Sequence, residues 1–404
     1  MSEPEKSSNY IVAEAQLLAE RARRDKAAVL KDIGEPIELP GKALAIEVQG
    51  NSAWIAENTT VVKKLDLESG KVLQIYKGHT APVTCIAFYN PDRKLLISGS
   101  WDKTIRVWDT KTKVLLSTTP DAHSDFVKTV VVLPSLNLLL SGGSDKIVRF
   151  WDLTDVTKPL QNAGSISSHT RPVECIAGYA ISDTSAVIYT ADTMGVIRVW
   201  NLQKEPETTP PLWRATARGE LNHHRTRINE LLVGKDLVWT ASADETVQIH
   251  PAIEVENLSE DAAALKGPKA ITHPVAARAL LPLTLTELGE PYLLTVAGDV
   301  LRVYDISSLS DPELLSSTDI HWHDVTAIRL WYRTTVKEDV KHTEPWIVTT
   351  SLDQTIRKWR LTELLNPTPP PAPEEKKKTE LEPIRESDLT EEEERELAEL
   401  LDED

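Results

Sequence analysis

A short segment that ends in Trp-Asp, or in a close variant of it, recurs along the chain and constrains the fold more than any other feature. Its clearest copies are Ile97–Asp109, Leu140–Asp152 and Thr349–Trp359. In each copy, two runs of alternating apolar and polar residues flank a polar turn, which predicts two antiparallel strands joined tightly. A histidine stands upstream of each copy, with an apolar residue four positions later, as in His79 and Val83. Self-similarity at a period of roughly 20 to 50 residues indicates a repeat architecture.

The spacing of these residues resembles that of the WD-repeat (WD40) family, over roughly residues 35–361. In that family a His, a Ser or Thr, an Asp and a Trp form a hydrogen-bonded tetrad that ties together the strands of one blade of a β-propeller. The resemblance implies complete tetrads in blades two, three and seven, which are His79, Ser98, Asp102 and Trp108; His123, Ser141, Asp145 and Trp151; and His321, Thr349, Asp353 and Trp359.

Other copies depart from this pattern. Blade four has Met194 where the Asp belongs, and blade five has His250 at the Trp position. Blade six has a turn one residue shorter, with His273, Thr295, Asp299 and Tyr304 at the tetrad positions. Because an incomplete hydrogen-bond network stabilises less than a complete one, we expect blades four to six to be held less tightly.

The residues at the Trp position give seven units and predict an all-β, seven-bladed propeller over residues 35–365; they are Leu65, Trp108, Trp151, Trp200, His250, Tyr304 and Trp359. The blades should lie near 42–76, 79–119, 123–162, 169–220, 224–270, 273–318 and 321–361. No room for a fourth strand remains after Trp359, so we expect residues 36–39 to close the ring and remove its exposed edges. The longer repeats imply insertions, expected as loops, at 203–222, 251–272, 282–291 and 333–344.

Both flanks of the propeller offer further elements. Residues 1–34 are expected to form an N-terminal helical extension, and its apolar stripe either packs on the propeller or binds a partner; the stripe is Ile11, Ala15, Leu18 and Ala22. Residues 366–404 should form a Pro-rich spacer and an acidic tail. A helix predicted within 390–401 carries Leu397, Leu400 and Leu401, as a motif that folds on a partner or as part of a solubilising tail.

Charge and cysteine content exclude several classes of protein. The net charge is −17, and residues 372–404 hold 15 acidic and 5 basic side chains, which argues against direct nucleic-acid binding. The two cysteines, Cys85 and Cys175, are too few for a disulfide framework or a zinc site. No run of 18 apolar residues occurs, so we expect no membrane span and place the chain in the cytoplasm, the nucleus or both. Lys376–Lys378 are either a nuclear localisation patch or part of a solvated tail.

The sequence contains no arrangement typical of an enzyme. The repeat histidines and aspartates belong to different blades, so they cannot converge on one metal ion or one substrate. No phosphate-binding Gly loop, Gly-x-Ser-x-Gly elbow or Cys-His pair occurs. We therefore predict no catalytic residues, no metal, no cofactor and no small-molecule ligand.

Propellers of this kind usually recruit partners on the narrow face around the central channel. If the apolar residue four positions after the tetrad His points into the core, the residues three and five positions after it should reach that face. So should the residue before the turn Asp. These positions predict a partner-binding arc made of Trp101, Phe126, Lys128, Arg227 and Arg278, because Trp and Arg dominate interface hot spots. The alternative for Trp101 is packing against a neighbouring loop.

The favoured function is a non-enzymatic scaffold or assembly factor that binds a peptide or helix of one or more proteins within an intracellular complex. One alternative is a substrate receptor of a ubiquitin ligase, although Trp108-Asp109-Thr110-Lys111 lacks the Arg of the signature of such receptors. Another is an assembly factor linked to ribosomes or RNA processing that uses its acidic tail. Fold alone does not decide among them.

Overall fold

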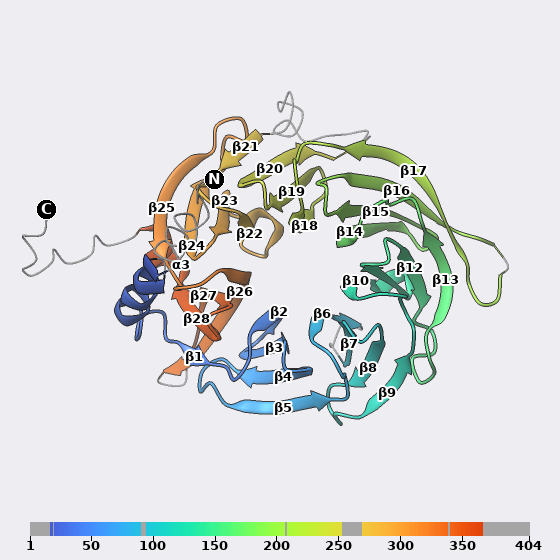
Figure 1. The fold of residues 1–404 in the computed structure, drawn as a ribbon, viewed down its shortest axis with the longest axis horizontal. Coiled ribbons are helices and arrows are strands. Elements are labelled where there is room, and N and C mark those ends of the chain that lie inside the picture. The colour runs from blue at the N-terminus through green and yellow to red at the C-terminus, as the bar shows by residue number, and fades with distance from the viewer. Residues whose placement is uncertain are drawn as a thin grey trace, which may run out of the picture. The chain divides into compact units, whose positions relative to one another are not determined.

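The computed structural model describes residues 17–366, apart from 19, 90–93, 207, 253–268 and 338–339. Within this part of the chain, 28 strands form seven four-stranded antiparallel sheets arranged around a central axis (Figure 1). The chain is thus a seven-bladed β-propeller, as the repeat count predicts. No helix among the described residues is long and apolar enough to cross a membrane.

The strands of the first four blades run from the axis outwards in sequence order. Blade one is β2 (Ala43–Gln49), β3 (Ser52–Glu57), β4 (Val61–Asp66) and β5 (Val72–Lys77). Blade two is β6 (Val83–Tyr89), β7 (Leu95–Ser100), β8 (Ile105–Asp109) and β9 (Leu115–Thr119). Blade three is β10 (Val127–Leu133), β11 (Leu138–Gly143), β12 (Val148–Asp152) and β13 (Gln161–Ile166), with a 3-10 turn at Pro134–Leu136. Blade four is β14 (Val173–Ser182), β15 (Ser185–Asp192), β16 (Ile197–Lys204) and β17 (Trp213–Leu221).

The remaining blades follow the same order. Blade five is β18 (Ile228–Val233), β19 (Leu237–Ser242), β20 (Thr246–Pro251) and β21 (Lys269–Thr272). Blade six is β22 (Ala277–Pro282), β23 (Tyr292–Ala297), β24 (Val300–Asp305) and β25 (Glu313–Asp319), with a 3-10 turn at Leu283–Leu285. Blade seven is β26 (Val325–Lys337), β27 (Val340–Ser351), β28 (Thr355–Arg360) and β1 (Ile37–Glu38), and the short helix α3 (Leu361–Leu365) follows it.

The two ends of the propeller meet in blade seven. Strand β1 pairs antiparallel with β28, with Ile37 opposite Ile356 and Glu38 opposite Thr355. The N–H of Leu39 extends the ladder by donating to the carbonyl of Gln354 at 2.8 Å. A strand from the start of the propeller therefore completes the last blade, and the ring has no open radial edge.

The hydrophobic core lies between blades rather than within one layer. Buried residues of the described chain form seven clusters, and each cluster joins two neighbouring blades. For example, Trp54 of blade one and Trp108 of blade two share a cluster. The cluster across the closure unites Ile37 and Ile55 with Trp331 of blade seven. Burial of apolar area in every interface stabilises the ring as a whole, because each blade buries its faces only against its neighbours.

Two predicted loops are strands instead. The segment 333–344 extends a hairpin of β26 and β27, in which Arg333 lies opposite Glu344 and Lys337 opposite Val340. Most of the segment 203–222 belongs to β16 and β17, which pair from Lys204 and Trp213 onwards. In both places the strands of the blade continue further than expected, and their backbone N–H and C=O groups are hydrogen bonded in the ladder. The Pro- and Thr-rich composition of these segments had suggested loops. Most of the segment 251–272 lies outside the described residues.

A helix over residues 20–29 precedes the propeller and lies beside blade seven (Figure 1). Of its predicted apolar stripe, Leu18 is 61% exposed and Ala22 is exposed as well, so these two residues do not pack on the propeller. The stripe residues Ile11 and Ala15, the tail leucines Leu397, Leu400 and Leu401, and Lys376–Lys378 lie outside the described residues.

Candidate binding face

A cavity of about 300 Å³ opens at the end of the channel where the seven inner strands begin. Every blade contributes to its wall; the lining residues are Leu44, Thr84, Trp101, Lys128, Glu174, Arg227, Asn229, Arg278, Asp324, Val325, Thr326 and Leu352. Four of the five residues of the predicted arc therefore meet in one cavity. Phe126, the fifth, is not part of the wall but contacts Trp101.

A β-bulge near the start of each inner strand directs one side chain into this cavity. The register of β6 with β7, for example, passes from Val83 to Cys85 and leaves Thr84 unpaired. The residues skipped in the seven blades are Leu44, Thr84, Lys128, Glu174, Asn229, Arg278 and Thr326, and all of them line the cavity. Because a bulge turns the extra residue away from the ladder, the backbone itself decides which residue of each blade is presented.

Trp101 and Phe126 form the apolar part of the face. Their ring centroids lie 5.0 Å apart and the ring planes differ by 19°, so the two rings are stacked. Trp101 remains 37% exposed and Phe126 38% exposed, although both are large apolar side chains. The N–H of Trp101 donates to the carbonyl of Pro82 at 3.0 Å, which fixes the turn that carries the indole. The stack leaves a rigid aromatic surface in contact with water.

The cations of the arc differ in how far their charge is compensated. Nζ of Lys128 lies 3.5 Å from a carboxylate oxygen of Glu174, and a guanidinium nitrogen of Arg278 lies 2.7 Å from one of Asp324. Arg227 instead donates through Nε to the amide oxygen of Asn229 at 3.0 Å. The wall thus carries three cations and two carboxylates, and the charge at Arg227 is the least compensated.

Beneath the cavity, an ion-pair cluster spans the channel. Nε of Arg329 in blade seven lies 3.4 Å from Glu47 of blade one, and its Nη1 lies 3.3 Å from Glu230 of blade five. A second oxygen of Glu230 accepts the N–H of Leu280 at 2.7 Å. Desolvation raises the pKa of Glu230, against the opposing effect of Arg329. These contacts hold non-adjacent blades at fixed separation and give the face a rigid floor.

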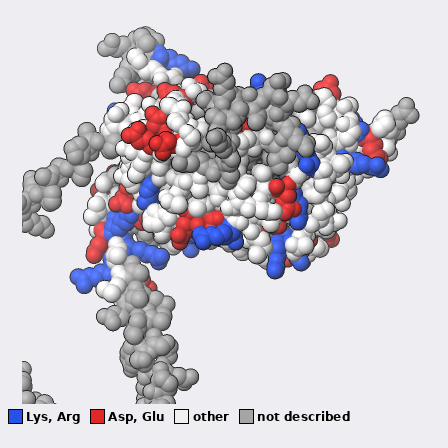
Figure 2. Space-filling view, turned by 90° about the horizontal axis from the view of Figure 1, so that it is seen from above, with Lys and Arg blue, Asp and Glu red and all other residues white. Residues whose placement is uncertain are grey.

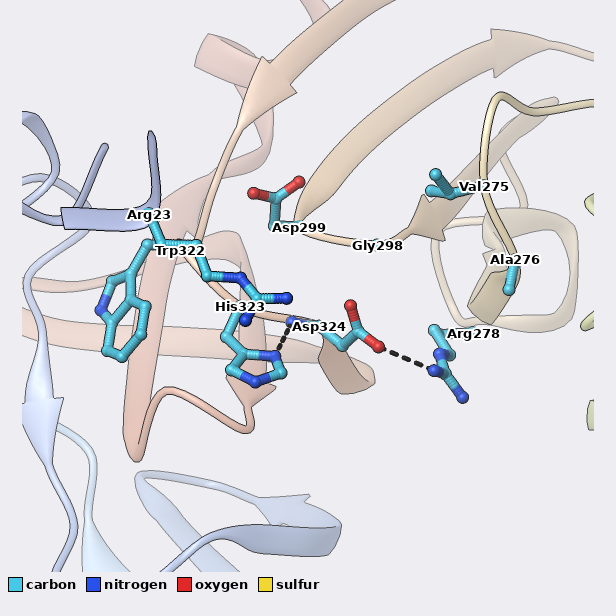
Figure 3. Close-up of a pocket in the computed structure, with 9 residues that line it drawn as sticks. All are labelled: Arg23, Val275, Ala276, Arg278, Gly298, Asp299, Trp322, His323 and Asp324. Atoms are coloured by element: carbon cyan, nitrogen blue, oxygen red, sulfur yellow. Dashed lines mark hydrogen bonds and ion pairs between the residues drawn. The ribbon is translucent and has the colours of Figure 1, made fainter. Parts of the chain in front are cut away.

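A second cavity, of about 240 Å³, adjoins the first and shares Arg278 and Asp324 with it (Figure 3). Blades six and seven form most of its wall, and Arg23 of the N-terminal helix completes it. Trp322 and His323 lie on the loop that leads into β26. This cavity has no signature in the sequence, because it depends on how the N-terminal helix lies against the ring.

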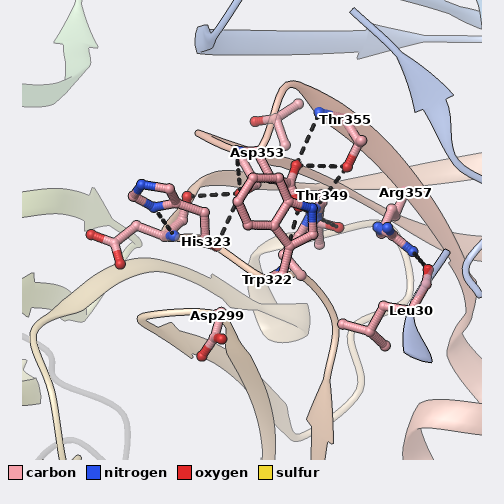
Figure 4. A network of polar contacts seen from close by, with 12 residues as sticks. Leu30, Asp299, Trp322, His323, Thr349, Asp353, Thr355 and Arg357 are labelled. Carbon is pink, nitrogen blue, oxygen red and sulfur yellow. Dashed lines mark hydrogen bonds and ion pairs between the residues drawn. The ribbon is translucent and has the colours of Figure 1, made fainter. Parts of the chain in front are cut away.

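The residues that the resemblance assigns to tetrads lie as follows in blades two, three and seven. In blade two, Nδ1 of His79 lies 2.8 Å from Asp102 and its Nε2 lies 2.8 Å from Ser98, whose hydroxyl also accepts the indole N–H of Trp108 at 2.9 Å. Blades three and seven repeat this set through His123, Ser141, Asp145 and Trp151, and through His321, Thr349, Asp353 and Trp359. Figure 4 shows Thr349 and Asp353 of the blade-seven set. Each Asp also accepts the N–H two positions further on, so the same carboxylate fixes the turn next to the face.

Blade four contains a carboxylate that contacts its tetrad histidine, although the expected Asp position holds Met194. Asp192, two residues before Met194, lies 3.4 Å from Nδ1 of His169 and accepts the N–H of Met194 at 2.9 Å. Thr190 contacts His169 and accepts the indole N–H of Trp200. The expectation that blade four lacks the carboxylate is therefore wrong, because Asp192, two positions before the expected one, also reaches His169. Met194 is left 51% exposed.

Blades five and six lack parts of the set. In blade five, His224 contacts Asp244 and Thr240, while His250 stacks on His223 with centroids 4.3 Å apart. In blade six, neither ring nitrogen of His273 nor the hydroxyl of Thr295 has a partner among the described residues, although both side chains are buried. Burial, and then the charge of Arg302, lower the pKa of His273 to about 4. Burial and the charges of His223 and His224 lower the pKa of His250 to about 3.

Metal-ligand clusters and activated cysteines do not occur among the described residues. Among them, no group of three or more His, Cys, Asp or Glu side chains is placed to hold a metal ion. Burial raises the pKa of Cys85 to about 12 and that of Cys175 further, so neither is a ready thiolate. On the side drawn in Figure 2, acidic and basic side chains are interspersed over the described surface, which does not suit a polyanion.

Comparison with known proteins agrees with the geometry. A family model for the WD domain, G-beta repeat, matches residues 70–109 and 114–152. The chain is 27% identical, over 88% of its length and 89% of the relative's, to an uncharacterized WD repeat-containing protein of Schizosaccharomyces pombe. It is 28% identical, over 24% of its length, to SAGA complex subunit Spt8 of the same yeast, and 42% identical, over 14%, to a periodic tryptophan protein 2 homolog of Mus musculus. These matches cover only 19% and 6% of those two relatives.

Proposed function

We propose that this chain, a seven-bladed β-propeller of the WD-repeat family, is a non-enzymatic scaffold or assembly factor that binds a protein partner on its narrow face. WD-repeat proteins in general act as interaction scaffolds. The proposal that this chain binds its partner on the narrow face is supported above all by one observation. Trp101 and Phe126 form a stacked and exposed pair at the rim of a cavity to which all seven blades contribute. Exposed aromatic anchors beside arginines are typical of interface hot spots.

The chemistry of the wall indicates what kind of partner fits. An apolar side chain of the partner would lie on Trp101 and Phe126, and an acidic one would approach Arg227. The wall carries both positive and negative charges, and some of them are paired, for example Lys128 with Glu174. The partner must therefore also form hydrogen bonds with these paired groups. A peptide or helix with both apolar and acidic residues meets these requirements. A polyanion such as nucleic acid does not, because two of the three cations, Lys128 and Arg278, are already paired with carboxylates.

Membership of a multiprotein complex and an intracellular location belong to the same proposal. One relative is named as a subunit of the SAGA complex, and the likeness extends over 24% of this chain. Cys85 and Cys175 are both free thiols, as is common in reducing compartments. We infer that the protein works in the cytoplasm, the nucleus or both.

The test compares the partners of matched variants in cells. Full-length protein carrying Trp101→Ala with Arg227→Glu is crosslinked and purified beside the wild type, and bound proteins are quantified by mass spectrometry. The control carries Ile181→Ala with Arg214→Glu, which remove the same kinds of exposed group away from the face. We expect the control to retain the wild-type partners and the face variant to lose them. Equal recovery by a folded face variant would contradict the proposal.

A further inference from the structure

The second cavity has hydrogen-bond donors among the residues of its wall. Nδ1 of His323 accepts the N–H of Asp324 at 2.7 Å, so a neutral His323 carries its proton on Nε2 and can donate from there. Arg23 extends its guanidinium from the N-terminal helix into the same space (Figure 3). Trp322 lies next to His323, with ring centroids 6.1 Å apart, and supplies an apolar wall.

The carboxylates around this cavity are already paired. Asp324 pairs with Arg278 at 2.7 Å, and Asp299 pairs with Lys26 at 2.6 Å. Lys26 also pairs with Asp319 at 2.5 Å. Arg23 forms no ion pair with any carboxylate in the described part of the chain. Its charge therefore remains available to an incoming anion.

The N-terminal helix that carries Arg23 is fixed to the ring by its polar side and its last turn. Leu30 is buried, and the guanidinium of Arg357 donates to the carbonyls of Leu30 and Ile33 (Figure 4). The carbonyl of Gly34 accepts the N–H of Lys358 at 2.6 Å. Gly34 has φ +76°, and a Cβ there would lie 2.7 Å from the ring of Trp359. The position of Arg23 is thus set by contacts of the helix and its last turn with residues of blades six and seven.

We propose that this second cavity binds a carboxylate side chain, Asp or Glu, of the peptide that the narrow face recognises, with Arg23 and His323 as donors. The proposal rests on the proposed function and extends its binding site beyond the Arg278–Asp324 pair onto the N-terminal helix. Trp322 contacts the methylene groups of the bound side chain. The N-terminal helix is accordingly part of the binding site and contributes to its choice of partner.

The probes for the test are three synthetic 12-residue peptides that share one leucine- and phenylalanine-containing sequence. They carry glutamate, glutamine or phosphoserine at the same positions. Each is titrated into the full-length chain labelled with ¹⁵N-tryptophan, and the indole N–H signals of Trp101 and Trp322 are followed, assigned through Trp101→Phe and Trp322→Phe. The two signals report on the first and second cavities separately.

We expect the glutamate peptide to shift both signals and the glutamine peptide to shift that of Trp101 alone. Arg23→Glu should weaken binding of the glutamate peptide about tenfold, the size expected for one charge-assisted hydrogen bond. Arg21→Glu, on the same helix but outside the cavity wall, should leave it unchanged, and Lys26→Glu should weaken it because the helix is no longer held at Asp299.

Several results would overturn the inference. If the glutamate peptide shifts Trp101 but not Trp322, the second cavity is no part of the site, while the proposed function stands. If only the phosphoserine peptide shifts Trp322, the cavity binds phosphate rather than carboxylate. If no peptide shifts either signal, recognition of acidic peptides by this face is rejected together with the second site. Equal effects of Arg23→Glu and Arg21→Glu would exclude a specific role for Arg23.

Discussion

The ammonium of Lys26 lies 2.6 Å from a carboxylate oxygen of Asp299, the residue at the tetrad Asp position of blade six. His273, which the repeat pattern would pair with that carboxylate, has no hydrogen-bond partner among the described residues. The N-terminal helix thus pairs with Asp299, a carboxylate at a tetrad position that forms no hydrogen bond with the histidine of blade six. In blade six, Asp299 therefore anchors the N-terminal helix through Lys26 instead of hydrogen bonding to His273.

Replacing Lys26 should release the helix without unfolding the propeller. Lys26→Ala removes the ion pairs to Asp299 and Asp319, and both pairs are partly exposed. Because partly exposed ion pairs contribute little, we expect the free energy of unfolding to change by less than about 1 kcal/mol. Amide hydrogen exchange over residues 20–29 should become faster, while β26 to β28 keep their protection. Unchanged exchange in the helix would show that Lys26 does not hold it.

The histidines of blades three and six should differ sharply in their contribution to stability. His123→Leu removes one buried hydrogen-bond partner from each of Ser141 and Asp145, and we expect a loss of about 3 kcal/mol. His273→Leu replaces a buried ring that has no hydrogen bond, so we expect a change within about 1 kcal/mol. Urea unfolding of both variants at pH 7 measures the difference. Equal losses would contradict the hydrogen-bond assignments.

The same histidine predicts a pH dependence. The pKa of His273 falls from 6.5 to about 4 on folding, so between these values the unfolded chain binds a proton that the folded chain does not. Stability should therefore decrease as the pH falls from about 6.5 to about 4, by up to about 3 kcal/mol from this group, and level off below. His273→Leu should reduce this slope. Paired tetrad aspartates such as Asp102 have lowered pKa values, so their stabilisation is lost only at more acidic pH.

Blade four provides a test of which carboxylate serves its tetrad. Asp192→Ala should lower the free energy of unfolding by about 2 kcal/mol, because His169 and the N–H of Met194 lose their acceptor. Met194→Ala should change it by less than about 0.5 kcal/mol, since that side chain is mostly exposed. Met194→Asp, which restores the family pattern in the sequence, should not stabilise the protein. A clear gain from Met194→Asp in thermal unfolding would instead favour position 194 as the site of the tetrad carboxylate.

The repeat made much of the fold predictable. Tetrad residues stand at fixed spacing because their side chains must meet across adjacent strands, and the alternation along each strand indicated which residues reach the narrow face. Four residues of the predicted arc line one cavity, although Lys128 and Arg278 are turned into it by bulges rather than by alternation. The bulges that turn Lys128 and Arg278 inwards have no signature of their own in the sequence.

Other features depend on contacts between distant residues. Arg278 is paired with Asp324, 46 positions away in the next blade, so the charge of the face could not be read from residue types alone. One of the two alternatives had the helix pack on the propeller through its apolar stripe, whereas it is anchored through Lys26 and Leu30. Asp192 does not follow from the repeat spacing, because it stands two positions before the residue where the repeat places the Asp.

The central claim is that the narrow face binds a protein partner through Trp101, and a dissociation constant tests it most directly. With a partner identified by crosslinking, calorimetric titration of purified full-length Trp101→Ala should show about 30-fold weaker binding, as for a hot-spot aromatic worth about 2 kcal/mol. Ile181→Ala, an equally simple truncation of an exposed apolar side chain, should bind like the wild type. An unchanged dissociation constant for a folded Trp101→Ala variant would contradict the account.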